Sequence, residues 1–437
     1  MYKLISEVAF MSPLLICQNI LSGIQKKISS PDFTSIYHEK NRFVRKRKLN
    51  IVQVIFYLLY SSKASMFLNL SGIRDDIPDI AFPEVSKQAV SKARNAISPA
   101  LFRDLFHFSA ETFYASHTDR NLWHGYHLFA VDGSTVQVPK TKQNDVYFGV
   151  CHNQHKSRED AMAGISVLYD ISNDILVDGI IQKYPQAERS AARKHLEYLE
   201  TVGLSKKQII LFDRGYPSYD LFRYISEKGY FFLMRVQKNT TSLTQLGAAD
   251  AVTQYLPRER KKEQPVMVRV IHIILDDGTD ECLVTNLFDP DLDAELLKEL
   301  YFYRWGIEGK YNELKNQMEL EEFTGATPTS VEQDFYISLL LMNLCALIKA
   351  DADAAIKKDT ETSGNRFQYQ ANRAFLLGKM KKRLVLMLCG SVGIPLELER
   401  MLQESVKRRS QIQPDRKCKR PRIQLRRRHC KNRKTCM

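Results

Sequence analysis

The spacing of apolar residues predicts helices in the first part of the chain. Apolar positions recur every three or four residues in residues 49–60. Phe102, Leu105 and Phe106 repeat this spacing in a further helix that begins after Pro99. Residues 1–118 are therefore expected to form a helical region.

A short polar helix in this region follows a turn at Phe82-Pro83, and its side chains could enter a DNA groove in a helix-turn-helix arrangement. These side chains are Lys87, Gln88, Ser91, Lys92 and Arg94. The alternative is a structural helical bundle, but the basic residues in the 42–48 run favour DNA. We therefore interpret residues 1–118 as a DNA-binding region.

From Tyr126 the apolar pattern changes to the two-residue period of strands. Residues 127–139 predict a strand that has Asp132 at its end and turns at Gly133. A hairpin of two strands, a helix, a strand, a helix and a strand then follow in residues 161–170, 175–184, 186–200, 208–213, 218–229 and 230–236. Asp213 ends a short apolar strand of the kind that is buried in a sheet. This order predicts an α/β fold with a ribonuclease H-like mixed sheet, in which both aspartates lie at the ends of neighbouring strands.

The remaining patterns divide the chain into regions. The interval between Asp213 and Glu308 is too long for one helix and one strand, and it contains a hairpin pattern. The predicted division is a helical region 1–118, a first part of the sheet domain 119–236, a β-rich insertion 237–292, a second part of the sheet domain 293–350, a helical C-terminal region 351–406 and a basic disordered tail 407–437.

The stretch 301–321 predicts a helix with chemically informative side chains on one face. Tyr301, Arg304, Glu308 and Lys315 fall within an arc of about 60° at the helical spacing of about 100° per residue. Arg304 and Lys315 suit phosphate oxygens, and Tyr301 offers a ring or a hydroxyl. The alternative is a solvated face on which Glu308 pairs with Arg304.

Asp132, Asp213 and Glu308 together indicate a metal centre. Two carboxylates about 4 Å apart repel by roughly 4 kcal/mol at an effective dielectric near 20, so a compensating cation is expected. Oxygen ligands favour Mg²⁺ or Mn²⁺, and two such ions could catalyse phosphoryl transfer at a phosphodiester. The alternatives are a turn residue at Asp132 and a local ion pair between Asp213 and Arg214.

The net charge of +14 is concentrated at one end of the chain. Residues 407–437 contain 14 of the 64 Lys and Arg residues and one of the 50 Asp and Glu residues, which leaves a charge of +1 on residues 1–406. A polycationic tail with few apolar residues is typical of a disordered nucleic-acid tether. An unselected extension of the chain is the alternative.

Other sequence features argue against several classes of protein. No phosphate-binding loop occurs, because Gly309-Lys310 is followed by Tyr311, so no nucleotide cofactor is expected. No uninterrupted apolar run reaches the roughly 18 residues of a membrane span, so no membrane is expected. The eight cysteines show no paired C-x-x-C spacing, which is typical of free thiols in a reducing cytosol. A metal site at Cys151, His152 and His155 is disfavoured.

The spacing Tyr-x2-Arg-x3-Glu-x6-Lys at residues 301, 304, 308 and 315 resembles the signature of a subgroup of bacterial insertion-sequence transposases of the DDE type. The sequences VDGST around Asp132 and FDRGY around Asp213 are also similar to this family. The resemblance covers residues 128–325 and includes the β-rich insertion.

The resemblance implies more than the residues alone. Asp132, Asp213 and Glu308 would be the catalytic metal ligands, with Mg²⁺ or Mn²⁺ as two ions, while Tyr301, Arg304 and Lys315 would hold the terminal phosphates of the element. The expected activity is water-driven cleavage at the element end, attack by the freed 3′ hydroxyl to form a hairpin, reopening, and joining to target DNA. The implied partners are the terminal inverted repeats, target DNA and a second copy of the chain, in a bacterial cytoplasm in association with the nucleoid.

Two other functions remain open at this point. One is a catalytically silent DNA-binding derivative, which the presence of all three acids disfavours. The other is a metal-dependent nuclease that cuts DNA without joining it.

The basic tail yields a quantitative expectation. If about seven of its cations contact phosphates, the logarithm of the DNA affinity should fall with the logarithm of the salt concentration with a slope near −6 from this segment. Removing residues 407–437 should make the slope measured by fluorescence anisotropy correspondingly shallower. An unchanged slope would refute the tether.

Overall fold

The computed structural model describes residues 11–39, 42–43, 48–116, 121–152, 159–204, 207–237, 242–246, 248–274, 278, 280–363 and 367–412. Several features of the sequence analysis lie outside these ranges. They are the central part of the basic run at 44–47, His155, the residues Asp276 and Asp277 in the turn of the hairpin predicted between Asp213 and Glu308, and the tail from residue 413 onward with its three cysteines.

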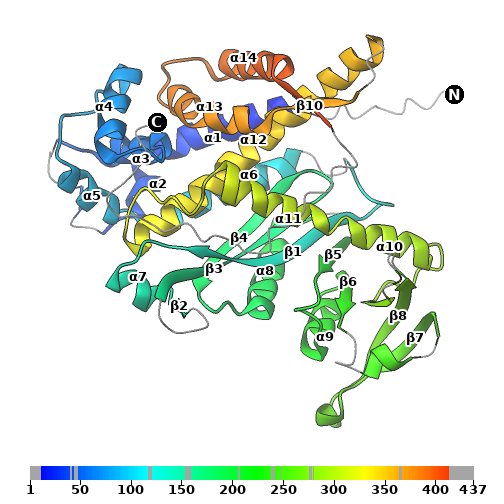
Figure 1. Cartoon of the computed structure of the whole chain (residues 1–437). Helices are drawn as coiled ribbons and strands as arrows, with labels where there is room; N and C mark the ends of the chain where they lie inside the picture. Colours follow the sequence, from blue (N-terminus) through cyan, green and yellow to red (C-terminus); the bar gives the residue numbers. More distant parts are fainter. Residues whose placement is uncertain are drawn as a thin grey trace. The chain divides into compact units, whose positions relative to one another are not determined.

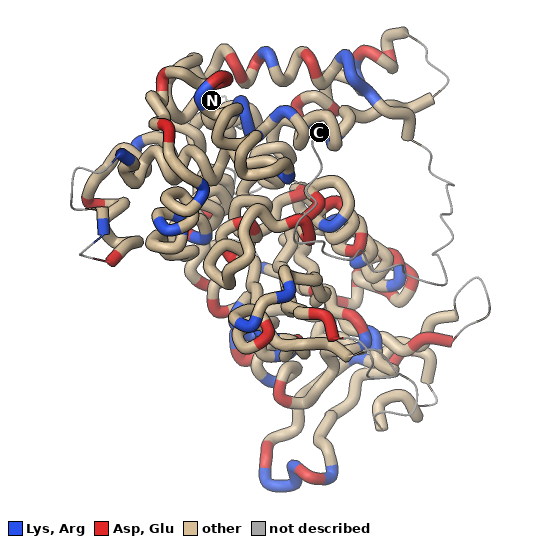
Figure 2. Tube along the Cα trace, turned by 60° about the vertical axis from the view of Figure 1, so that its left-hand side comes forward, with Lys and Arg blue, Asp and Glu red and all other residues tan. Residues whose placement is uncertain are grey.

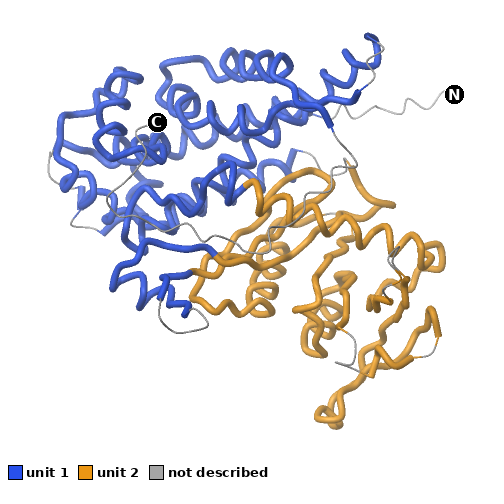
Figure 3. The backbone as a smooth tube through the Cα atoms, viewed as in Figure 1, with its two compact units in different colours: residues 1–117, 136–162, 314–437 blue, residues 118–135, 163–313 orange. Residues whose placement is uncertain are grey.

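The chain divides into two compact units (Figure 3). Unit 1 consists of residues Met1–His117, Val136–Met162 and Leu314–Met437, and unit 2 consists of Thr118–Thr135 and Ala163–Glu313. Asp132, Asp213, Tyr301, Arg304 and Glu308 all belong to unit 2, whereas Lys315 belongs to unit 1.

Unit 1 is mainly helical, as the sequence predicts for both ends of the chain. Its main helices are α1 Pro13–Ser29, α2 Pro31–Ser35, α3 Ile51–Tyr60, α4 Met66–Asp76, α5 Lys87–Asn95, α6 Ala100–Ser116, α7 Lys142–Tyr147, α12 Pro328–Thr362, α13 Arg373–Leu388 and α14 Ile394–Lys407. Helix α12 is the core of this unit and packs against α1, α6, α13 and α14 (Figure 1). The strand β2 Val150–His152 pairs with residues 159–161, and β10 Tyr369–Ala371 pairs with β11 Arg409–Gln411.

Helix α12 is apolar on nearly every side because other helices surround it. Within the described residues it is the one helix long and apolar enough to cross a membrane, although the sequence has no uninterrupted apolar run of that length. In this structure 78% of the 18-residue apolar stretch of this helix is buried inside the protein. Packing in a protein core therefore accounts for its composition.

A buried ion pair connects α5 to α12. The Arg94 guanidinium donates to Asp334 at 2.7 Å, to Gln333 at 2.8 Å and to the carbonyl of Ser330 at 2.9 Å. Burial alone would raise the pKa of Asp334, but Arg94 and the backbone N–H of Thr324 help to hold it below its usual range. The prediction that Arg94 reads a DNA groove is wrong, because this side chain is only 4% exposed and is bound within the core.

The sheet of unit 2 has the predicted mixed arrangement. Its core strands are β1 His127–Gln137, β3 Glu159–Asp170, β4 Ile175–Lys183, β5 Gln208–Phe212 and β6 Phe231–Val236. They lie in the order β4-β3-β1-β5-β6, in which β3 and β4 are antiparallel and β1, β5 and β6 are parallel. This is the ribonuclease H-like order. The residues of β1 and β3 that belong to unit 2 are 127–135 and 163–170.

The strands within the predicted insertion extend this sheet. Strand β6 pairs with β9 Asp280–Thr285, which pairs with β8 Val266–Ile274, which pairs with β7 Asp250–Tyr255. The helices of unit 2 are α8 Glu188–Val202, α9 Tyr219–Glu227, α10 Ala294–Phe302 and α11 Trp305–Asn312, and α8 packs on β4 (Figure 1). The order strand, strand, strand, helix, strand, helix, strand is thus confirmed for β1, β3, β4, α8, β5, α9 and β6. The sequence patterns did not indicate α7 and β2.

A buried network of side-chain hydrogen bonds holds the backbone of β1 in place. His195 of α8 contacts Asp178 through Nδ1 at 2.7 Å and Ser166 through Nε2 at 2.9 Å. The Ser166 hydroxyl donates to the carbonyl of Asp132 at 3.1 Å. Ser166 is fully buried, so this Ser-His-Asp arrangement is a structural network and not an exposed nucleophile. It fixes the strand at the residue that carries the first aspartate.

The Arg94–Asp334 pair should contribute strongly to the stability of unit 1. Arg94→Met leaves a buried carboxylate without its cation and is expected to cost about 3–5 kcal/mol at neutral pH. Because the pKa of Asp334 is lowered by folding, this contribution is present above the unfolded value and is lost as the pH falls through the folded value. Hydrogen exchange of α12 along a urea series measures the loss.

The matched control is Arg103→Met, since Arg103 pairs with Asp104 at the surface, where the two side chains are 46% and 38% exposed. Such a pair is worth at most about 1 kcal/mol. Equal losses in the two variants would contradict the assignment of the buried pair.

Candidate active site

The pairing of β1 with β5 places two carboxylates side by side. The strands are parallel, and the last paired residues are Val131 and Phe212. Asp132 and Asp213 are the residues that come next along the chain, and adjacent parallel strands lie about 4.8 Å apart. The prediction that the two aspartates come from neighbouring strands is therefore confirmed.

The predicted turn at Gly133 is wrong. Strand β1 continues through Asp132 and Gly133 to Gln137, so Asp132 lies within the strand and only Asp213 follows the end of one. A Cβ at Gly133 would lie 2.9 Å from Nε2 of Gln186 and 3.3 Å from Oε1 of Glu188. Close approach by these two side chains, and not a turn, accounts for the glycine.

Asp132 is in an environment that disfavours its charged form. Burial raises the pKa of Asp132 to about 7, and the carboxylates of Asp213 and Glu188 add to this effect. The backbone N–H of Gly133, which donates to Asp132 at 2.8 Å, and the Arg304 guanidinium act in the opposite direction. Burial is therefore the main reason why Asp132 resists ionisation in this structure.

The predicted single helix over residues 301–321 is broken. Helix α10 ends at Phe302, α11 begins at Trp305, and the π-helix η4 covers Glu313–Gln317. The regular rotation of about 100° per residue does not continue across these breaks, so helix geometry alone no longer places the four side chains on one face. Lys315 lies on the π-helix in unit 1 and is half-buried.

Tyr301, Arg304 and Glu308 nevertheless contact one another or the aspartates. Arg304 donates to Glu308 at 3.2 Å, and its guanidinium lies 5.6 Å from the centre of the Tyr301 ring. The Tyr301 hydroxyl donates to Asp213 over a long 3.4 Å. The link from Asp213 through Tyr301 and Arg304 to Glu308 thus connects the sheet to α11 within unit 2.

Tyr301 and Arg304 are more buried than side chains on a solvated face would be. They are 5% and 3% exposed, and Nε of Arg304 has no hydrogen-bond partner among the described residues. The next-door aromatic residues Phe302, Tyr303 and Trp305 are about half exposed. Arg304 therefore serves first as the cation that faces the carboxylates.

Three further residues lie near the aspartates; the sequence suggests only that Tyr216 positions the loop after Asp213, and it assigns no role to Tyr311 or Glu188. The Tyr311 hydroxyl donates to the carbonyl of Asp132 at 2.7 Å. Tyr216 is 1% exposed, and its hydroxyl has no hydrogen-bond partner in the part of the chain that the structure describes. Burial raises the pKa of both tyrosines, and nearby Asp132 and Glu188 raise it further. The motif FDRGY contains Tyr216, but nothing in the sequence marks Glu188.

The donor chemistry fits a hard divalent cation. Asp132, Asp213 and Glu308 supply only oxygen atoms, which are the ligands that Mg²⁺ and Mn²⁺ prefer. Within the described ranges, no three His, Cys, Asp or Glu side chains are yet close enough to form a metal site. Glu308 accepts a hydrogen bond from Arg304 through Oε1 at 3.2 Å in this arrangement.

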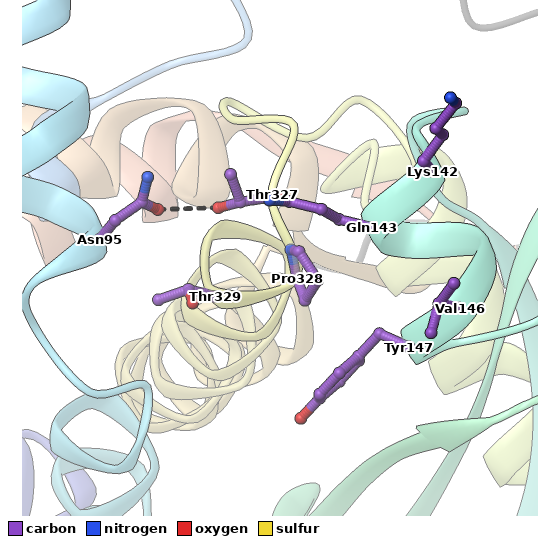
Figure 4. A pocket seen from close by; sticks show the side chains of 8 residues that line it. All are labelled: Asn95, Lys142, Gln143, Val146, Tyr147, Thr327, Pro328 and Thr329. Atoms are coloured by element: carbon purple, nitrogen blue, oxygen red, sulfur yellow. Dashed lines mark hydrogen bonds between the residues drawn. The ribbon is translucent and has the colours of Figure 1, made fainter.

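The cavities of the two units differ in chemistry. Unit 1 has an open cavity of about 710 Å³ lined by Asn95, Lys142, Gln143, Val146, Tyr147, Thr327, Pro328 and Thr329 (Figure 4). It contains no carboxylate, so it does not suit metal chemistry. Unit 2 has a cavity of about 280 Å³ lined by residues 186–190 and Gly215, next to the aspartates. Basic and acidic residues are interspersed along the described chain of both units (Figure 2), in keeping with the near-neutral charge of residues 1–406.

Comparison with known proteins places the chain among transposases. The family model described as "Transposase DDE domain" matches residues 123–344. Two proteins of Escherichia coli (strain K12) are similar in sequence. "Putative transposase InsZ" is 25% identical over 46% of this chain and 66% of its own length, and "Transposase InsG for insertion sequence element IS4" is 24% identical over 60% of this chain and 61% of its own length.

The chain thus spans less than two thirds of the length of each of these relatives. A cryo-EM structure of the piggyBac transposase synaptic complex with hairpin DNA matches with a TM-score of 0.45 and 10% identity, over 91% of this chain and 84% of that chain. The family match covers the strands of Asp132 and Asp213 and the helix of Glu308. Because it extends over just over half of the sequence, the chain belongs to the transposase DDE domain family.

Proposed function

We propose that this protein is a DNA transposase of an insertion sequence that cuts and pastes its element by metal-dependent phosphoryl transfer. The observation that carries the proposal is the pair of half-buried carboxylates placed by the Val131–Phe212 register, with Glu308 on a helix of the same unit. Family membership supports DNA as the substrate. We further propose that the chain belongs to the subgroup with the Tyr-Arg-Glu-Lys signature.

Asp132, Asp213 and Glu308 would hold two Mg²⁺ or Mn²⁺ ions as oxygen ligands. When bound, such ions lower the pKa of water and stabilise charge on a phosphodiester. Asp132 gives up its proton on binding, because the cation favours its charged form. The partial burial of Asp132 strengthens these electrostatic interactions.

The reaction has two kinds of step that use the same carboxylates. In cleavage, a water oxygen attacks the phosphorus at the element end, the bond to the 3′ oxygen breaks, and a 3′ hydroxyl and a 5′ phosphate result. In transfer, that 3′ hydroxyl attacks another phosphodiester, and a new bond from its oxygen to phosphorus forms. The bond from that phosphorus to the 3′ oxygen of the attacked strand breaks, and the displaced oxygen leaves as a 3′ hydroxyl, so one proton is given up and one is taken up. We propose a hairpin on the element end as the first transfer product, followed by reopening and joining to target DNA.

Tyr301, Arg304 and Lys315 would hold the terminal phosphates of the element. Arg304 combines two roles in this proposal, because its guanidinium already pairs with Glu308 and its Nε has no hydrogen-bond partner among the described residues. A phosphate oxygen would take the place of Glu308 on the guanidinium as Glu308 turns to the cation. The exposed rings beside Arg304 offer stacking surfaces for bases.

The proposed partners are the terminal inverted repeats, target DNA and a second copy of the chain that bridges both ends. Helix α5 is the proposed DNA-reading part of unit 1, with Gln88 and Lys92 exposed on it. We place this activity in the bacterial cytoplasm, at the nucleoid.

Glu308→Gln should abolish cleavage while leaving DNA binding intact. The neutral amide keeps the size of the side chain but loses the charge that a metal ligand needs, so cleavage should fall by about 1,000-fold or more. The assay follows labelled DNA that carries the element's own ends, with Mg²⁺ or EDTA. Glu295→Gln is the matched control, because the Glu295 side chain on α10 is 82% exposed.

Strand breaks at the element boundary that are lost in Glu308→Gln but kept in Glu295→Gln would support the proposal. Hairpin or joined products distinguish a transposase from a nuclease that only cuts. Binding without cleavage by the unaltered protein in Mg²⁺ and Mn²⁺ would identify a catalytically silent DNA-binding derivative instead.

Lys315→Ala should weaken DNA-end binding by one phosphate contact. The slope of log affinity against log salt should become shallower by about one, because one fewer counterion is released. Lys379→Ala, an exposed position on α13, serves as the control and should leave the slope unchanged. If Lys315→Ala and Lys379→Ala have the same slope as the parent protein, Lys315 does not contact phosphate.

A further inference from the structure

We propose that Glu188 is a fourth carboxylate of the same centre and ligates one of the divalent cations beside Asp132 and Asp213. This inference rests on the proposed function, since it assigns a further ligand to the proposed metal centre. It concerns a residue that neither the sequence signature nor the DDE triad includes.

Both carboxylate oxygens of Glu188 point to residues that adjoin the aspartates. A Cβ at Gly133 would lie 3.3 Å from Oε1 of Glu188, and a Cβ at Gly215 would lie 2.8 Å from Oε2. Gly133 follows Asp132, and Gly215 lies two residues after Asp213. Glu188 therefore lies between strand β1, which carries Asp132, and the segment that follows Asp213. Glycine at positions 133 and 215 leaves room for its carboxylate.

The surrounding contacts hold Glu188 in place without neutralising it. Arg189 donates from Nε to the carbonyl of Tyr216 and from a terminal nitrogen to that of Pro217, both at 3.1 Å, so the start of α8 is fixed to the segment after Asp213. The neutral amide of Gln186 donates to Oε1 of Glu188 at 3.2 Å. In the described part of the chain, no Lys, Arg or His side chain forms an ion pair with Glu188, although Arg189 is its neighbour in sequence.

An independent observation points to a polar ligand at this place. The Tyr216 hydroxyl is buried and has no hydrogen-bond partner among the described residues, which is rare in folded proteins. The carboxylates of Asp132, Glu188 and Asp213 are close enough to raise its pKa together with burial. Water bound to a cation between these carboxylates would supply the partner that the hydroxyl lacks.

The space and the charge both suit a hydrated cation. The cavity of about 280 Å³ is lined by Glu188 and Gly215, and a water molecule occupies about 30 Å³ in the liquid. Asp132, Asp213 and Glu308 bring three negative charges, whereas two divalent cations bring four positive ones. Glu188 supplies the fourth negative charge, which lowers the cost of holding both cations in a buried site.

The competing explanation is structural. Glu188 begins α8, where a carboxylate stabilises the helix through its dipole by about 0.3–1 kcal/mol. In that case its removal would lower stability slightly and leave metal binding unchanged. Metal binding therefore has to be measured directly, apart from activity.

The test is Mn²⁺ binding to the full-length protein, followed by electron paramagnetic resonance of free Mn²⁺ and by calorimetry, for the parent protein, Glu188→Gln and Glu308→Gln. We expect Glu188→Gln to weaken one Mn²⁺ site by about 10-fold or more, in the range found when groups that support a metal site are removed. Glu197→Gln is the matched control, because Glu197 is exposed further along α8. It should bind Mn²⁺ as the parent protein does.

Glu188→Asp keeps the charge on a shorter side chain and should weaken the same site less than Glu188→Gln does. Thermal unfolding of each variant separates lost binding from lost folding. Mn²⁺ affinities of Glu188→Gln and Glu188→Asp equal to that of Glu197→Gln would overturn the proposal. Failure of the parent protein to cleave DNA, with Mn²⁺ binding that depends on Glu188, would refute the proposed function and leave the ligand assignment intact.

Discussion

The parallel register of β1 and β5 is the constraint on which the candidate site depends. Because Val131 pairs with Phe212 and an aspartate follows each of these residues, the register places the two carboxylates side by side. Burial and mutual repulsion make the charged state costly, as the raised pKa of Asp132 shows. The backbone is nevertheless held at this point by Ser166 and Tyr311, which both donate to the carbonyl of Asp132.

Arg304 explains how the site stays folded with so much negative charge. Its guanidinium is buried, lies over Tyr301 and pairs with Glu308, and it also lowers the pKa of Asp132. A protein cation thus provides part of the compensation in the arrangement described here. In the proposed reaction, divalent cations and phosphate would take over these contacts, and Glu308 would exchange Arg304 for metal.

The sequence predicted the sheet better than it predicted the site. Short apolar runs and their order were sufficient for β1, β3, β4, β5 and β6, since strand patterning is a local property. Gly133 was misinterpreted because Asp-Gly usually indicates a turn, whereas here the glycine makes room for residues from the start of α8. The break between α10 and α11 and the π-helix were not predictable from a single period. The partner of Arg94 lies 240 residues away in sequence, so only the tertiary structure could reveal it.

The most direct test of the account is a structure of the protein with Mn²⁺ and a DNA end, in which anomalous scattering locates the metal. The account predicts Mn²⁺ between Asp132 and Asp213, with Glu308 released from Arg304 and bound to the cation. Ordered Mn²⁺ bound elsewhere, with Asp132 and Asp213 free of metal and Glu308 still paired with Arg304, would contradict it.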